Sequence, residues 1–228
     1  MKKFISVFAF SFICIFAFSQ FFEDFSEQDL SINNWQGDLD NFKVSTSTAI
    51  PANMRPGLQL DDDITNISYI VAPYNFDFAD STEWIFWIKL SFTPTLNNFA
   101  RVYISSAQKE INGNIDGYYI SIGETDKRIN FVKQNADNHT VLITSPLTQL
   151  AKSTNEVRIR LLRNSDSEWK LYSDTLGTEN WTLEGEVVDS SYTSSSWHGL
   201  YCKYTSSNSK KVYFDDFYAG AVQVDTIN

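Results

Sequence analysis

Apolar side chains recur at every second position along several segments of the chain, and this alternation constrains the fold more strongly than any other feature of the sequence. The segment from Trp84 to Phe92 is the clearest case, because its even-numbered positions are all Trp, Phe, Ile or Leu. Residues 100–105, 117–123 and 156–162 repeat the pattern. Successive side chains of a β-strand point to opposite faces, so a period of two predicts strands with one face in a core. Such strands are typical of antiparallel sheets.

Further short segments rich in β-branched and aromatic residues follow one another along the chain, separated by Asn, Asp, Gly and Ser, which favour turns. Only residues 146–152 suit a helical turn. We therefore predict an all-β domain in which two antiparallel sheets enclose one core, with more strands than an immunoglobulin domain has. The strands are predicted to begin near Phe21, Phe42, Leu58, Ser68, Glu83, Ala100, Gly117, Ile129, Thr140, Glu156, Glu168, Leu183, Ser196 and Lys211.

The first residues have the layout of a secretory signal peptide. Lys2 and Lys3 are followed by a long uncharged apolar run, which ends in the small-residue pattern around Ser19. This run is shorter than the roughly 20 residues that a membrane-spanning helix needs. We therefore expect residues 1–19 to be removed, residues 20–220 to form the sandwich and the last eight residues to be a tail. The mature chain is expected to be secreted or displayed at the cell surface, with no membrane span.

The composition argues against one class of partner, nucleic acids, and against one means of stabilising the fold, a disulfide. The formal net charge of −10 repels phosphate backbones, so we expect no nucleic acid partner. Of the two cysteines, Cys14 lies in the leader, which leaves Cys202 alone and excludes a disulfide within the mature chain. We expect Cys202 to be a buried, inert thiol.

Four stretches taken in order resemble the concanavalin A-like lectin and glucanase jelly roll. They are residues 21–25 (FFEDF), 84–87 (WIFW), 116–123 (DGYYISIG) and 212–218 (VYFDDFY). More closely, the chain looks like the amino-terminal module of large exported bacterial surface proteins. The resemblance implies a two-sheet antiparallel jelly-roll sandwich whose concave sheet binds or cleaves polysaccharide in family members, with a structural calcium ion (Ca2+) in some of them.

Trp87, Arg101, Tyr103 and Tyr119 are the candidate ligand-binding residues. Each one projects from the side of its strand opposite the apolar residues. Sugar rings lay their apolar C–H faces on aromatic rings, and arginine donates hydrogen bonds to their hydroxyls. Our first hypothesis is therefore a non-catalytic module that binds a polysaccharide or glycoconjugate through its concave sheet. The alternative for these residues is that a loop or a second layer covers the aromatic rings.

A glycoside hydrolase of the same fold is the second hypothesis, and a structural or adhesive spacer is the third. A retaining glycosidase needs two carboxylates about 5 Å apart, and the Glu-x-Asp-x-x-Glu spacing of the family is absent. The nearest substitutes are Glu184 with Glu186 on the polar face of a strand, and Glu124 with Asp126 in a turn. Solvated strand faces and hairpin tips explain both pairs, so we predict no catalytic residue.

The two histidines do not change this conclusion. His139 falls in the polar run 135–140, which predicts a turn, and His198 follows Trp197 near the end of a predicted strand. No nucleophile elbow and no zinc-binding helix motif accompanies them. We interpret His198 as a packed or edge histidine.

The closing strand changes the parity of its apolar residues. They are even-numbered up to Phe214 and odd-numbered from Phe217, which predicts a β-bulge between Asp215 and Asp216. The ends of a sandwich often pair, so Asp24 is expected nearby. Calcium takes six to eight oxygen ligands, and these three aspartates are our candidate ligands for a structural Ca2+ ion. The alternative is that they accept backbone hydrogen bonds at the bulge.

Overall fold

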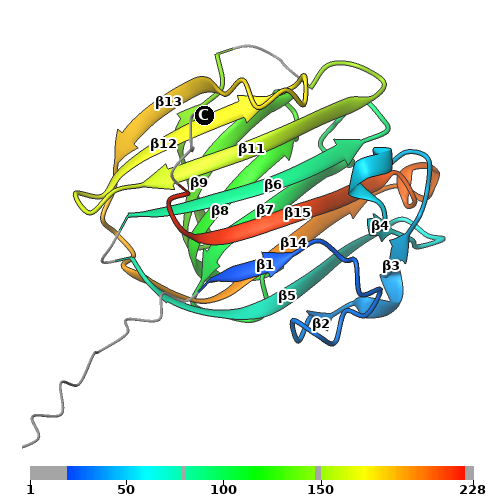
Figure 1. The fold of residues 1–228 in the computed structure, drawn as a ribbon, viewed down its shortest axis with the longest axis horizontal. Coiled ribbons are helices and arrows are strands. Elements are labelled where there is room, and N and C mark those ends of the chain that lie inside the picture. Colours follow the sequence, from blue (N-terminus) through cyan, green and yellow to red (C-terminus); the bar gives the residue numbers. More distant parts are fainter. Residues whose placement is uncertain (1–19, 79–80, 147–149, 224–228) are drawn as a thin grey trace, which may run out of the picture.

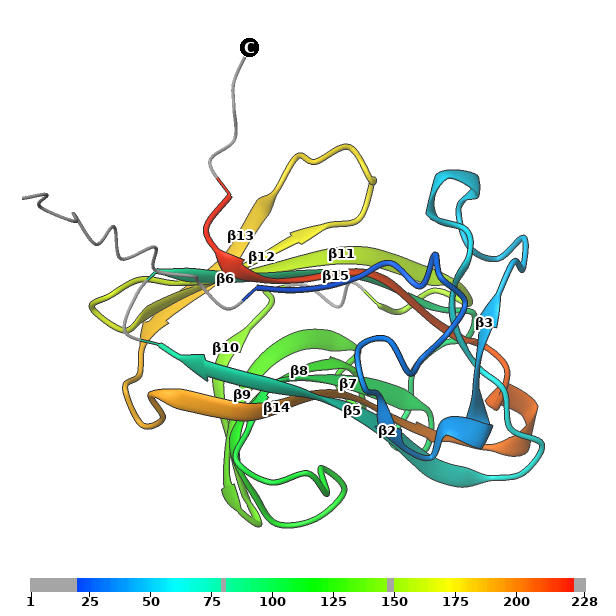
Figure 2. The same cartoon turned by 60° about the horizontal axis from the view of Figure 1, so that its bottom comes forward.

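Two stacked antiparallel sheets make up the part of the chain that the computed structural model describes, which is residues 20–78, 81–146 and 150–223 (Figure 1, Figure 2). Sheet A has the strand order β13-β12-β11-β6-β15-β4-β3, with β1 also paired to β15, and sheet B has the order β10-β9-β8-β7-β14-β5-β2. The predicted all-β sandwich is confirmed. The strands are β1 (Phe21–Glu23), β2 (Gln36–Gly37), β3 (Phe42–Ser45), β4 (Gly57–Leu60), β5 (Asn66–Asp77), β6 (Thr82–Leu90), β7 (Phe99–Ser106), β8 (Ile115–Gly123), β9 (Arg128–Ala136), β10 (Asn138–Thr144), β11 (Asn155–Arg163), β12 (Glu168–Asp174), β13 (Thr182–Val188), β14 (Ser194–Tyr204) and β15 (Val212–Ala221).

The alternation locates the strands closely. Every predicted start lies within two residues of an observed one, and β2 is the strand that the sequence does not predict. The predicted helical turn includes residues 147–149, which lie outside the described residues, as does the predicted leader, 1–19. None of the helices in the described residues is long and apolar enough to cross a membrane. Those helices are η1 (Leu39–Asn41), η2 (Ala52–Met54) and η3 (Ser206–Asn208), all of the 3-10 type.

The chain crosses repeatedly between the two sheets, which is the connectivity of a jelly roll. β5 and β7 belong to sheet B, for example, whereas β6 between them belongs to sheet A. The first and last strands also meet, because β1 pairs with β15 and places Phe21 opposite Ala219. Both ends of the described sandwich therefore lie side by side in sheet A (Figure 1).

The inner faces of the sheets pack against each other through one apolar core. The even-numbered residues of β6, from Trp84 to Leu90, all lie in it, as their alternation predicts. Trp169 of β12 is fully buried, and its ring lies 5.6 Å from the ring of Trp84 in the same sheet. It also lies 4.9 Å from the ring of Tyr118 and 4.8 Å from that of Phe131, both in sheet B. Aromatic contacts around Trp169 thus join the two sheets.

Two residues with potentially reactive side chains are buried in this core. Cys202 is confirmed as a buried thiol, and burial raises its pKa. The imidazole of His198 on β14 lies 4.0 Å from the ring of Phe21, 5.0 Å from that of Trp35 and 5.9 Å from that of Tyr74. Burial lowers the pKa of His198 to about 3, so the ring is neutral at physiological pH. The interpretation of His198 as a packed histidine is confirmed.

A β-bulge divides β15, as the change of parity predicts. Its register with β6 shifts after Asp215, and Asp216 has a φ of +53°. The bulge lets Phe214 and Phe217 both face the core. It also buries Asp215, which is 1% exposed and accepts a hydrogen bond from the N–H of Asp216 at 2.9 Å. Burial, together with the charges of Asp216 and Asp24, raises the pKa of Asp215 to about 8.

Replacing the buried indole at the junction of the sheets tests the packing. Trp169→Ala should lower the free energy of unfolding by about 3–5 kcal/mol, because it removes apolar contacts and leaves a cavity. Leu176→Ala is the control, since Leu176 is 78% exposed and its loss should change the free energy by less than about 0.5 kcal/mol. Urea unfolding measures both values. Similar small losses in the two variants would contradict the role given to Trp169.

Asp215→Asn tests the burial of a carboxyl group at the bulge. The pKa of Asp215 is about 8 in the folded chain against 3.8 for the free side chain, so the unfolded chain releases its proton first as the pH rises. Stability should therefore fall with rising pH across this window in the wild type. The asparagine variant should lack this loss, with a higher Tm than the wild type at pH 8 and a similar Tm near pH 3. Thermal unfolding in EDTA at several pH values measures the Tm of each variant. Asp137→Asn is the control, because Asp137 is exposed. Parallel curves for Asp215→Asn and the wild type would refute the assignment.

Candidate functional site

Three of the predicted ligand-binding residues converge on the outer face of sheet B, the face turned away from the core. Arg101 and Tyr103 lie on β7, and Tyr119 lies opposite Tyr103 on β8. Phe99 of β7 and Tyr201 of β14 complete a group that we call the Arg101 cluster. Figure 2 shows their strands in the layer opposite the one that holds β6 and β15. Alternation along β7 and β8 therefore separates this cluster from the core.

The guanidinium of Arg101 is held by aromatic rings and by one carboxylate. It lies 5.2 Å from the centre of the Phe99 ring, 4.7 Å from that of Tyr119 and 5.4 Å from that of Tyr201. Its Nε donates to Oε1 of Glu124 at 2.9 Å. Burial alone would lower the pKa of Arg101, but Tyr119 and Glu124 raise it above its usual value. The site thus keeps a fixed positive charge beside a carboxylate.

The tyrosine rings of this cluster are closed to a flat ligand. Tyr103 and Tyr119 are 1% and 2% exposed, and Ile111 from the loop between β7 and β8 belongs to the same apolar cluster. The Tyr103 hydroxyl donates to Gln134 at 3.2 Å, and burial raises the pKa of Tyr103 to about 12. The rings are covered, as in the alternative that the sequence left open. They support Arg101 and do not offer a stacking surface.

Ser121 and Asn130 add polar atoms to this face that the fold does not use. Ser121 on the central strand β8 lies opposite Asn130 of β9. Across the other edge of β8, Ser121 lies opposite Arg101 of β7. Ser121 Oγ and Asn130 Oδ1 are buried and have no hydrogen-bond partner within the described residues. Other buried atoms, such as Trp84 Nε1 and His198 Nε2, also lack a partner within the described residues, so an ordered water is sufficient to satisfy these two. The alternation along β9 predicts that Asn130 points away from the core, because Ile129 and Phe131 on either side of it lie in the core.

His139 lies at the edge of the same face. It belongs to β10 and not to a turn, so the sequence prediction for it is wrong. The chain turns earlier, near Ala136 with a φ of +53°, and the first residues of β10 are polar because they are exposed. His139 Nδ1 lies 3.1 Å from the Tyr119 hydroxyl. Burial and the charge of Arg101 lower the pKa of His139.

Trp87, the fourth predicted ligand-binding residue, lies on the other side of the sandwich. It belongs to β6 of sheet A, where it packs with Ile50 and Tyr213 and is 2% exposed. Its Nε1 donates to Glu156 at 3.2 Å. The outer faces of the two sheets point in opposite directions, so Trp87 and Arg101 cannot bind one ligand together. The structure corrects the single predicted surface to two separate locations.

Neither predicted carboxylate pair has the geometry of a glycosidase. The register between β12 and β13 shifts beside Glu184, which places Glu184 and Glu186 on different faces of the sheet. Glu184 is buried and accepts a hydrogen bond from Ser173 at 2.5 Å, whereas Glu186 is exposed. The prediction that they share a polar face is therefore wrong. Glu124 and Asp126 lie in the turn between β8 and β9, as predicted, and the ion pair described above holds Glu124.

The three predicted calcium ligands share one neighbourhood at the junction of β1 and β15. The charge of Asp24 helps to raise the pKa of both Asp215 and Asp216, after burial, so the three carboxyls influence one another. The carboxylate of Asp216 also lies 3.6 Å from the guanidinium of Arg158. Across the described ranges, no group of three or more Asp, Glu, His or Cys side chains is arranged to hold a metal ion. The three aspartates therefore do not form a ready-made ligand set.

Comparison with known proteins gives a result at the level of the fold. No protein-family model matches the sequence, and no curated protein matches it. The VIP36 exoplasmic/lumenal domain with Ca2+ and Man3GlcNAc bound superposes with a TM-score of 0.64 and 9% identity, over 91% of this chain and 90% of that chain. The Emp47p carbohydrate recognition domain gives a TM-score of 0.62 and 11% identity, over 90% of this chain and 96% of that chain.

A bacterial structure belongs to the same group. The carbohydrate-binding module CBM66 from Bacillus subtilis gives a TM-score of 0.53 and 12% identity, over 82% of this chain and 95% of that chain. These neighbours are concanavalin A-like jelly-roll domains that bind carbohydrate. The sequence identities are low, so the likeness concerns architecture alone. This chain therefore has the concanavalin A-like jelly-roll fold that its sequence motifs predict.

Proposed function

We propose that this chain is an exported, non-catalytic domain that binds a polysaccharide or glycoconjugate through the outer face of sheet B, with Arg101 at the centre of the site. The observation that carries the proposal is the pair formed by Arg101 and Glu124 at 2.9 Å, set on three aromatic rings. The fold supports it, because CBM66 is a carbohydrate-binding module and VIP36 was determined with sugars bound.

The Arg101–Glu124 pair suits neighbouring hydroxyls of a sugar ring. The guanidinium only donates hydrogen bonds and the carboxylate only accepts them, so together they satisfy a hydroxyl in both of its roles. The side chains of Arg101 and Glu124 remain 17% and 28% exposed. A sugar can therefore reach them from solvent without moving the buried rings.

The surrounding residues fit a supporting role in this site. The rings of Tyr103 and Tyr119 hold the guanidinium in one orientation, so little side-chain freedom is left to lose on binding. Ser121 and Asn130 each add to this face one buried atom that has no partner within the described residues. A water or a sugar hydroxyl at this point would satisfy them.

Export follows from the leader prediction for residues 1–19. We propose that the mature domain is secreted or held at the cell surface, where polysaccharides and glycoconjugates are available. The whole chain has a formal net charge of −10, and this acidity favours solubility and disfavours anionic polymers as partners.

Catalysis is less well supported than binding. The carboxylates of Glu184 and Glu186 lie on different faces of sheet A, and Glu124 is paired with Arg101. Two neighbours of the same fold are a carbohydrate recognition domain and a carbohydrate-binding module. A structural or adhesive spacer remains the alternative in which the outer face of sheet B binds no sugar.

Arg101→Ala should weaken glycan binding by roughly 10- to 100-fold, since a hydrogen bond to a charged group contributes about 1.5–3 kcal/mol. A glycan array followed by calorimetry on the best ligand measures it. Arg101→Lys keeps the charge but loses the planar donor set, so it should recover only part of the affinity. Lys170→Ala, on the exposed face of sheet A, removes the same charge and should leave binding unchanged.

Three outcomes would contradict this proposal. Equal binding by Arg101→Ala and the wild type would remove Arg101 from the site. Release of reducing sugars from a polysaccharide panel would favour the hydrolase. Absence of both binding and release would favour the spacer. Melting temperatures of all variants are compared first, because Arg101 also packs against Phe99 and Tyr201.

Calcium binding by Asp24, Asp215 and Asp216 is a separate part of the proposal. Its support is the shared neighbourhood of the three carboxyls and the Ca2+-bound form of VIP36, which has the same fold. An ion there would require the Asp215 carboxyl to ionise. If calcium binds, millimolar CaCl2 should raise the Tm over that in EDTA, and Asp215→Asn should abolish the rise. Equal melting temperatures in CaCl2 and EDTA would remove these residues from the list of ligands.

A further inference from the structure

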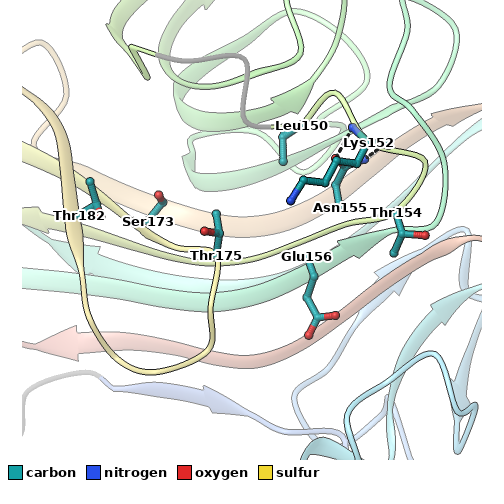
Figure 3. Close-up of a pocket in the computed structure, with 8 residues that line it drawn as sticks. All are labelled: Leu150, Lys152, Thr154, Asn155, Glu156, Ser173, Thr175 and Thr182. Carbon is teal, nitrogen blue, oxygen red and sulfur yellow. Dashed lines mark hydrogen bonds between the residues drawn. The ribbon is translucent and has the colours of Figure 1, made fainter.

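A pocket of about 540 Å³ opens in sheet A, at the point where β11 begins and β12 ends. Its volume falls within the range of roughly 300–1,000 Å³ that is typical of small-molecule sites. Figure 3 shows its lining residues on two sides, at the ends of the loop between β12 and β13 and on the segment that leads into β11. None of them belongs to sheet B, so the pocket is distinct from the Arg101 cluster. The lining residues are Leu150, Lys152, Thr154, Asn155, Glu156, Ser173, Thr175 and Thr182.

Side-chain hydrogen bonds hold the loop between β12 and β13, whose ends carry the lining residues Thr175 and Thr182. The carboxylate of Asp174 accepts three backbone N–H bonds from the loop, from Leu176 at 2.9 Å, from Gly177 at 3.0 Å and from Glu179 at 2.8 Å. Arg158 on β11 also lies 3.3 Å from the carboxylate of Glu179. Figure 2 shows the loop standing away from sheet A on its outer side. These contacts tie the loop to the end of β12 and to β11.

The opposite wall is held equally well. The Asn155 side chain donates to the carbonyls of Phe92 and Lys152, both at 2.8 Å, and accepts from the Lys152 N–H at 3.1 Å. The two oxygens of Glu156 pair with Trp87 at 3.2 Å and with Lys89 at 3.3 Å. These groups build the pocket and have little capacity left for a ligand.

Ser173 donates to Glu184 and is also occupied, whereas four other polar groups of the pocket are available. The hydroxyls of Thr154, Thr175 and Thr182 and the ammonium of Lys152 make no side-chain hydrogen bond with the part of the chain that the structure describes. Hydroxyls both donate and accept, as do those of a sugar, and the ammonium adds a donor. Leu150 is the one aliphatic residue among the lining residues, so an apolar ligand would leave most of these groups unpaired.

We infer that this pocket, the Thr175 pocket, is a second saccharide-binding site, which takes a neutral sugar residue through the hydroxyls of Thr175 and Thr182. The assignment of a sugar as the ligand class rests on the proposed function. The location rests on the pocket alone. One domain would then hold saccharide on both sheets, and a single copy would link two polysaccharide chains.

Nuclear magnetic resonance can report on both sites in one experiment. We would titrate the 15N-labelled protein with mannose, glucose, galactose and fructose and follow the backbone amides. At least one sugar should shift the amides of Thr175 and Thr182. The double variant Thr175→Val/Thr182→Val should raise the Kd from these amides about tenfold or more, since it removes two hydroxyls and keeps the shape. Thr175→Ser keeps the hydroxyl and should bind like the wild type.

The matched control is Thr178→Val on the same loop, where the hydroxyl already accepts a hydrogen bond from Asn180 at 3.1 Å. It should leave the Kd unchanged. Shifts around Arg101 and Glu124 without shifts at Thr175 would overturn the second site and leave the proposed function intact. Shifts at Thr175 alone would support the second site and count against the Arg101 site. A Kd that is unchanged in the double variant would overturn the inference.

Discussion

The packing of two apolar sheet faces against each other is the interaction on which the rest of this domain depends. Within the described residues no disulfide reinforces it, because Cys202 is a free, buried thiol. The connection between the sheets is instead aromatic, with Trp169 in contact with rings from both of them. Since the inner faces are fully used in this way, only the outer faces, the edges and the loops are left for ligands.

Alternation in the sequence was sufficient to place the strands and to say which side of each strand meets the core. It does not say which sheet a strand joins, because that depends on pairing between distant segments. Trp87 and Arg101 both point away from the core, but β6 pairs with β11 and β15, whereas β7 pairs with β8 and β14. The prediction of one aromatic surface failed for this reason. Coverage of the rings by Ile111 depends on a loop, whose path the pattern does not contain.

Two bulges show how far the alternation of apolar residues can predict local changes of register. The one in β15 could be predicted because Phe214 and Phe217 record the change of face in their own positions. The shift beside Glu184 leaves no such record, since the apolar neighbours Leu183 and Val187 keep one parity. A bulge is therefore readable from sequence only where core residues flank it on both sides. The pocket beside β11 was missed for a related reason, because its hydroxyls come from three segments that meet only in the fold.

The pairing of β1 with β15 has a mechanical consequence. Only three residue pairs join the two strands, from Phe21 with Ala219 to Glu23 with Phe217, and the first residue of β1 lies beside the last part of β15. A force that pulls the ends apart would therefore load these bonds one after another, as in a zipper, and not all together as in shear. The first strand would peel away at low tension and uncover the ring of Phe21 and its neighbour His198. Attached at both ends under load, the domain would yield at this seam while the rest of the sandwich stayed folded.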